Sequence, residues 1–123
     1  MAFVTTKFDK AVDYKIAYHS QITAAVTENL TGGPGTFYSI KIQNGNDAAV
    51  YVKASNAYTA TAGSTAPDWV FSCPAASTYF YEIPGGIAFD ALSVWATETA
   101  AENNSANPSV SGNESVQVTI VTG

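Results

Sequence analysis

Apolar residues recur at every second position in six short segments of the chain, and this alternation constrains the fold more than any other feature. The segments cover residues 22–27, 38–43, 50–54, 79–83, 92–95 and 116–120. A period of two places successive side chains on opposite faces of a strand, whereas a helix needs a period near 3.6. The sequence therefore predicts a series of half-buried strands.

Glycine, proline and asparagine separate these segments, as turn residues do in an all-β protein. Residues 44–47 (Asn-Gly-Asn-Asp) predict a hairpin, and Pro84-Gly85-Gly86 is expected to end one strand before the next begins. We expect an all-β fold, a single two-sheet antiparallel β-sandwich of about seven to eight strands, jelly-roll or immunoglobulin-like. A small barrel is the alternative.

The apolar rows also predict the core. Its expected members are Ile22, Val26, Ile40, Ile42, Val50, Val52, Ile83, Leu92, Val94, Val116, Val118 and Ile120. Residues 21–123 are expected to form the sandwich domain. Residues 1–20 are expected to form an N-terminal extended segment. It could be a further strand near residues 11–18 or an arm on a neighbouring subunit, and these two alternatives are compatible.

The charge balance excludes some classes of partner. The chain has five lysines, no arginine and ten acidic residues, and its net charge is −5. Nucleic-acid phosphates and anionic membranes both need clustered cations, so neither is expected as a partner. No signal-peptide pattern opens the chain and no apolar run is long enough to span a bilayer. The single cysteine, Cys73, excludes an intrachain disulfide, and synthesis in a reducing cytoplasm is expected.

No motif indicates catalysis. His19 is the only histidine, and no nucleophile elbow accompanies it, so we expect a structural residue at a strand end. The glycines at 32, 33 and 35 lack the lysine and helix that a phosphate loop requires, and a strand is expected to follow them. The sequence therefore predicts a protein that is not an enzyme and binds no cofactor.

Oxygen-bearing loop residues leave calcium as an alternative. These residues are Asn44, Asn46, Asp47, Glu98, Glu102 and Glu114. Their spacing does not match an EF-hand loop, and turn chemistry explains the Asn and Asp residues. We therefore expect no metal site.

Aromatic residues are the candidates for contacts with other molecules. Phe80 alternates with Tyr79 and Tyr81, and Trp95 follows Val94, so both are expected to face away from the core. Such side chains can anchor a protein interface or stack on a sugar. The interface candidates are Phe3, Phe8, Tyr14, Tyr18, Phe80 and Trp95.

Several short motifs carry a resemblance to a known group of domains. They are residues 26–35 (VTENLTGGPG), 50–53 (VYVK), 66–71 (APDWVF), 74–78 (PAAST), 83–89 (IPGGIAF) and 92–97 (LSVWAT). From about residue 21 onward, the chain resembles a small β-sandwich domain of tailed-bacteriophage virion proteins. It departs from that pattern at Ala91, where glycine is common, and at Ala54-Ser55, where a bulkier residue is common.

The resemblance implies a non-enzymatic virion component. A capsid decoration or cement protein would bind the head surface as a homo-oligomer, with a trimer favoured, and its partner would be the major capsid protein or another virion protein. The alternative is a fibre or knob module that attaches to host surface glycans. Either would be made in the host cytoplasm and located in the virion. Residues 1–18, which carry Lys7, Lys10 and Lys15, are expected to contribute to contacts with an acidic neighbour.

Overall fold

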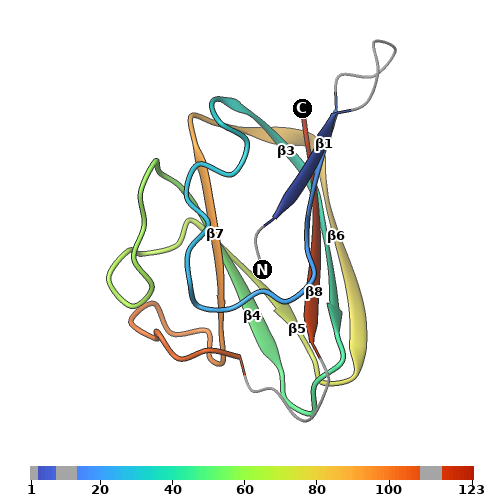
Figure 1. The fold of residues 1–123 in the computed structure, drawn as a ribbon, viewed down its shortest axis with the longest axis vertical. Coiled ribbons are helices and arrows are strands. Elements are labelled where there is room, and N and C mark those ends of the chain that lie inside the picture. Colours follow the sequence, from blue (N-terminus) through green and yellow to red (C-terminus); the bar gives the residue numbers. More distant parts are fainter. Residues whose placement is uncertain (1–2, 8–13, 109–114) are drawn as a thin grey trace.

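The computed structural model describes residues 3–7, 14–108 and 115–123, with residues 4–7 as backbone only. Its described residues form eight strands and no helix, arranged in two antiparallel sheets (Figure 1). The strands are β1 (Val4–Lys7), β2 (Lys15–His19), β3 (Gly35–Asn44), β4 (Val50–Asn56), β5 (Trp69–Cys73), β6 (Ser77–Phe89), β7 (Leu92–Thr97) and β8 (Val116–Thr122). The five-stranded sheet has the order β1-β2-β8-β3-β6, and the three-stranded sheet has the order β5-β4-β7. The predicted two-sheet sandwich is confirmed, and the barrel alternative is not.

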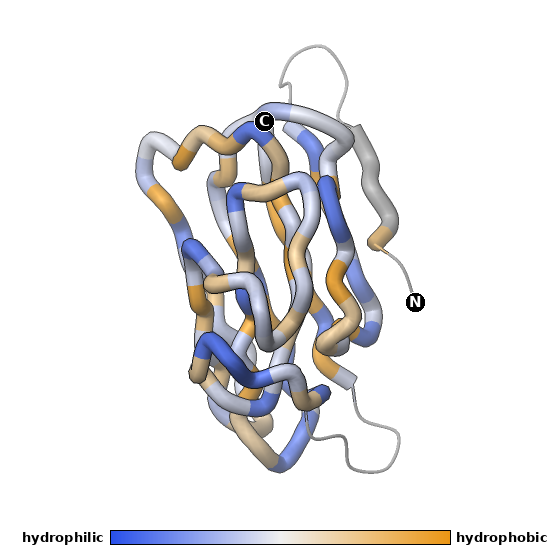
Figure 2. The backbone as a smooth tube through the Cα atoms, turned by 90° about the vertical axis from the view of Figure 1, so that its left-hand side faces the viewer, coloured by the Kyte–Doolittle hydropathy of each residue, from blue (hydrophilic) through white to orange (hydrophobic). Residues whose placement is uncertain are grey.

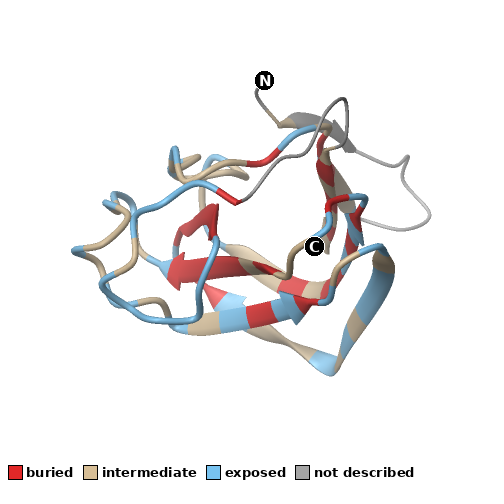
Figure 3. Ribbon diagram, turned by 90° about the horizontal axis from the view of Figure 1, so that it is seen from below, coloured by how far each residue is buried: buried red, intermediate tan, exposed pale blue. Residues whose placement is uncertain are grey.

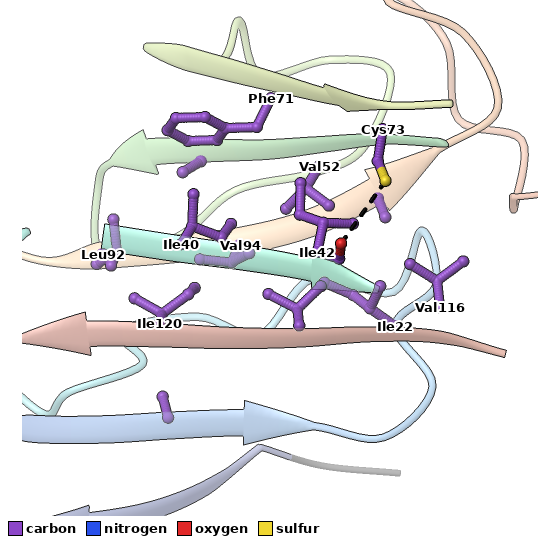
Figure 4. Packing of buried hydrophobic residues seen from close by; sticks show 14 of the residues in the cluster. Ile22, Ile40, Ile42, Val52, Phe71, Cys73, Leu92, Val94, Val116 and Ile120 are labelled. Atoms are coloured by element: carbon purple, nitrogen blue, oxygen red, sulfur yellow. Dashed lines mark hydrogen bonds between the residues drawn. The ribbon is translucent and has the colours of Figure 1, made fainter. Parts of the chain in front are cut away.

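The buried faces of the strands form the core, as the alternation of apolar residues predicts. Along β8, every second side chain is buried, and apolar and polar segments alternate along the strands in Figure 2. Buried residues lie along the strands, whereas most loop residues are exposed (Figure 3). Ile40 and Ile42 of β3 lie opposite Val94 of β7, and the Cys73 thiol donates a hydrogen bond to the carbonyl oxygen of Ile42 (Figure 4). Of the predicted core residues, all are buried except Val26 and Ile83, which are half-buried.

The first predicted strand, over residues 22–27, is not a regular strand. This segment runs beside β7 and forms one bridge, between Thr27 and Val94. The backbone N–H of Ala96 donates to the carbonyl of Thr23, so the contact continues along β7. The segment therefore covers the free edge of the three-stranded sheet without forming an additional strand of it.

Pro84-Gly85-Gly86 was expected to end a strand, and this expectation is wrong. β6 continues through these residues, and its pairing with β3 shifts between Phe37↔Ile87 and Ser39↔Glu82. Gly85 and Gly86 have φ values of 79° and 72°, which L-residues with a side chain rarely adopt. The three residues thus form a bulge within one long strand.

Part of the N-terminal segment belongs to the sheet. β2 pairs with β8 along five residues, from Lys15↔Thr122 to His19↔Val118. β1 pairs with the other side of β2. Residues 15–19 form part of the strand expected near residues 11–18, residues 11–13 lie outside the described residues, and contact with a neighbouring subunit stays a prediction. No described residue lies in a helix long and apolar enough to cross a membrane.

Trp95 faces away from the core, as expected, but it is buried and is not an exposed anchor. Its side chain does alternate with Val94, but every residue of β7 is buried. Loop segments cover the outer face of the three-stranded sheet, where Ser93 Oγ donates a hydrogen bond to the carbonyl of Ala57 and Thr97 Oγ1 donates to the carbonyl of Thr99. Trp95 is consequently 0% exposed, although the same face is open to solvent at β5, where Val70 is 42% exposed.

Candidate functional site

The outer face of the five-stranded sheet carries a row of side chains that crosses four strands. In the register of the sheet, Tyr18 of β2 pairs with Thr119 of β8, Thr119 pairs with Lys41 of β3, and Lys41 pairs with Phe80 of β6. Paired residues in adjacent strands point to the same side of a sheet. Phe80 is 61% exposed and Tyr18 is 36% exposed, so both ends of the row present an aromatic ring to solvent.

A groove of about 420 Å³ opens beside this row. Its aromatic lining comes from Tyr14, Tyr38 and Phe80, and the carboxylate of Glu82 lies among them. The remaining lining residues are Ser39, Ile83, Pro84, Gly85 and Val121. The groove falls within the usual size range of small-molecule pockets, about 300–1,000 Å³.

The bulge in β6 gives the groove its shape. A Cβ atom at Gly86 would lie 2.9 Å from Cε1 of Tyr38 and would also clash with the side chain of Thr36. Only glycine therefore allows the backbone of β6 to approach the Tyr38 ring this closely. The ring of Tyr14 packs edge-to-face against Tyr38, with centroids 5.3 Å apart, and so fixes the other side of the groove.

The chemistry of this surface is that of binding. The aromatic rings offer flat apolar faces, while Ser39, the tyrosine hydroxyls and Glu82 offer hydrogen-bonding groups. Lys41 lies in the row and Glu82 lines the groove, and their charges have opposite signs. The surface therefore suits a partner that presents an apolar or hydroxyl-rich face with little net charge.

Three of the six interface candidates come together here. Tyr14, Tyr18 and Phe80 all lie on this face, although Phe80 is distant from the two tyrosines in the sequence. Phe3 instead packs against the ring of His19, at a centroid distance of 4.8 Å. Trp95 lies buried in the other sheet, so the isolated chain does not present it as an anchor. The remaining candidate, Phe8, lies outside the described residues.

His19 occupies a structural position at the end of β2. Its side chain is buried, and burial lowers its pKa below the ordinary value of 6.5. The Nδ1 atom accepts a hydrogen bond from the backbone N–H of Gln21 at 3.1 Å. The ring thus holds the turn that follows the strand.

The part of the chain that the structure describes contains no cluster of side chains that would support the calcium alternative. Within residues 3–7, 14–108 and 115–123, no group of three or more His, Cys, Asp or Glu side chains is placed to hold a metal. Asn44 is buried and uses its amide in hydrogen bonds within the loops, and Glu98 and Glu102 extend from an exposed loop. Glu114 lies outside the described residues.

The glycine-rich stretch forms a turn before β3. The N–H of Gly32 donates to the carbonyl of Asn29, and Gly35 begins the strand. A strand follows the glycines, as expected from the sequence, so no helix N-terminus faces this loop.

Tyr38 and Glu82 line the groove but were not among the candidates from the sequence. Tyr38 was grouped with Ile40 and Ile42 in one apolar row, but the register shift between Phe37 and Ser39 reverses the alternation. Phe37 is therefore the buried residue and Tyr38 lines the groove. Glu82 carries no motif that marks it as a binding residue. The adjacent Pro-Gly-Gly sequence was the available signal, because such residues often accompany a bulge.

Comparisons of the chain with protein-family models, with curated proteins and with solved structures found no match.

Proposed function

We propose that the protein is a non-enzymatic structural protein of a bacteriophage virion, a capsid decoration protein that binds the head surface as a homo-oligomer. Its partner is the major capsid protein. The phage context is supported by the resemblance of the sequence from residue 21 onward. The observation that carries the proposal is the aromatic outer face of the five-stranded sheet, from Tyr18 to Phe80.

The outer face of an antiparallel sheet is normally polar, since only the inner face packs on the core. Here the exposed rings of Tyr18 and Phe80 lie at the ends of one row, with the groove beside them. Aromatic residues are enriched in the centres of protein interfaces, so two exposed rings on one sheet face favour a contact with another protein. A near-neutral aromatic face fits a shell that presents an apolar surface to it.

The chemistry of the described residues supports binding over catalysis. The neutral form of His19 is favoured by burial, which lowers its pKa, and its Nδ1 atom already accepts a backbone hydrogen bond. The Cys73 thiol is buried in the core, and burial raises its pKa, so its reactive thiolate form is disfavoured.

Co-sedimentation of the purified protein with phage heads tests this function. Tyr18→Ser and Phe80→Ser each remove an exposed ring without opening the core, and we expect each to weaken head binding by about tenfold or more. Tyr58→Ser is the matched control, because Tyr58 is 60% exposed but lies in the loop between β4 and β5. Equal binding of all three variants and the wild-type protein would contradict the proposal.

Attachment to host glycans is the second candidate function, and the groove favours it. Aromatic faces beside a carboxylate are the groups that stack on a sugar ring and accept hydrogen bonds from its hydroxyls. A glycan array with the wild-type protein and Glu82→Gln tests this alternative. Hits that disappear in the variant would support glycan attachment, and an array without hits would leave head binding as the function.

A further inference from the structure

The first half of β6 is an unprotected sheet edge. β6 is the terminal strand of the five-stranded sheet and, among the described strands, pairs only with β3 (Figure 1, yellow). Proteins usually protect an edge with a proline, a lysine or a bulge, because its free N–H and C=O groups can pair with another chain. Pro84 and the glycine bulge protect the second half of β6. Residues 77–83 have neither a proline nor a lysine, and residues 77–82 pair regularly with β3.

The sequence of this edge favours pairing with another strand. Residues 77–83 read Ser-Thr-Tyr-Phe-Tyr-Glu-Ile, which contains three aromatic residues and one charge. Segments of six or seven residues with high β-propensity, low charge and no proline pair readily when exposed. Tyr79 and Phe80 are both exposed in the single chain. A long edge of this composition is a hazard unless the native assembly covers it.

We propose that a second copy of this chain covers the edge, with the two β6 strands antiparallel about a two-fold axis at Phe80. This register places Phe80 opposite Phe80 of the other copy and Tyr79 opposite Tyr81. Aromatic pairs directly opposite each other stabilise antiparallel strands. Glu82 faces Thr78 rather than the other Glu82, so the register avoids opposing two carboxylates.

The segment matches itself in this register, as an isologous two-fold interface requires. The two five-stranded sheets would join into one sheet of ten strands, and their aromatic outer faces would lie side by side. The proposal deepens the homo-oligomer of the proposed function and rests on it. It also replaces the three-fold arrangement expected from the resemblance with a two-fold one.

Oxidative cross-linking of the full chain tests the position of the axis. Residues directly opposite each other in an antiparallel pair have Cα atoms about 4.5–5.5 Å apart, within the range that a disulfide bridges. We expect Phe80→Cys to form a covalent dimer under mild oxidation, since Cys73 is buried and does not compete. Tyr18→Cys, on the same face but on β2, is the control and should remain uncrosslinked. Equal cross-linking of the two variants would overturn the proposal.

A charge substitution at Thr78 tests the register without removing an aromatic residue. Thr78 is exposed, so neither variant should disturb folding. Thr78→Glu would place a carboxylate opposite Glu82 and should raise the dimer dissociation constant by about tenfold, whereas Thr78→Lys should leave the dimer as tight or tighter. Sedimentation equilibrium measures both, against a wild-type mass expected at twice 12.8 kDa. A monomeric or trimeric wild-type protein, or equal effects of the two substitutions, would overturn the pairing.

Head binding measured on the same samples separates this inference from the proposed function. A monomer that binds heads would overturn edge pairing and the homo-oligomer but would support the decoration function. A cross-linked dimer that fails to bind heads would support edge pairing and contradict the decoration function.

Discussion

The ammonium group of Lys53 donates a hydrogen bond to the backbone carbonyl oxygen of Ala101 at a distance of 2.6 Å. Lys53 lies on the outer side of β4 and is fully buried, and its register partner on β7 is Trp95. Burial lowers the pKa of Lys53 below its ordinary value, and the charge of Glu102 partly opposes this effect. The contact connects the loop after β7 to the three-stranded sheet.

Removing this contact should loosen the loop. Lys53→Met keeps an unbranched apolar side chain but leaves the Ala101 carbonyl without its donor, which costs about 1 kcal/mol or more. We expect amide hydrogens of residues 98–107 to exchange about five- to tenfold faster, as measured by mass spectrometry. Lys41→Met, the same substitution at an exposed position of β3, is the control. Unchanged exchange in Lys53→Met would show that the lysine does not hold the loop.

Acidification should destabilise the protein through His19. Because burial lowers the folded-state pKa of His19 below 6.5, the unfolded chain binds more protons than the folded chain below about that pH. The free energy of unfolding therefore falls as the pH is lowered from 7.5 through 6.5 toward the folded-state pKa. His19→Asn keeps an acceptor for the N–H of Gln21 but does not titrate. Urea denaturation at pH 7.5 and 5.0 should show a smaller loss for His19→Asn, and equal losses would contradict this prediction.

Gly86 should tolerate substitution less well than Gly85. Both have positive φ, so alanine at either costs about 1–2 kcal/mol of backbone strain. A Cβ atom at Gly85 meets open space, whereas one at Gly86 meets Thr36 and Tyr38. We expect Gly86→Ala to lower the free energy of unfolding by at least about 1 kcal/mol more than Gly85→Ala does. Thermal unfolding compares the two variants, and equal midpoints would argue against the close packing of β6 on Tyr38.

The side chain of Asn44 should contribute strongly to the free energy of unfolding, because it connects two loops at one end of the sandwich. Its side-chain NH₂ group donates hydrogen bonds to the carbonyl oxygens of Ala48, Cys73 and Pro74, at 2.9–3.2 Å. Asn44→Asp replaces these donors with a buried carboxylate and should lower the free energy of unfolding by about 3 kcal/mol or more. Gln43→Glu makes the same chemical change at an exposed neighbour and should change it by less than about 0.5 kcal/mol. Comparable losses in urea denaturation would contradict the role of Asn44.

Sequence alternation predicted the fold well where a strand has one buried face. Val116, Val118 and Ile120 of β8 are buried as expected, because β8 has solvent on its outer side and the core on the other. The prediction failed where one extra residue enters a strand. The register shift beside Tyr38 reverses the alternation, and no local residue type fixes the position of such a shift.

The candidate site was predictable only in part. Phe80 followed from alternation with Tyr81, which packs against the core side of β6. Trp95 obeyed the same rule but is buried, because distant loops cover its side of the sheet. Which outer face is covered depends on long-range loop packing, and the period of a single strand contains no information about it.

Attachment to phage heads through the outer face of the five-stranded sheet is tested most directly by cryo-electron microscopy of heads saturated with the purified protein. We expect density for the protein on the outer surface of the shell, with Tyr18 and Phe80 within contact distance of the major capsid protein. Phe80→Ser should lose most of this density at the same protein concentration. Heads without added density, or density with the aromatic face turned to solvent, would contradict the decoration function.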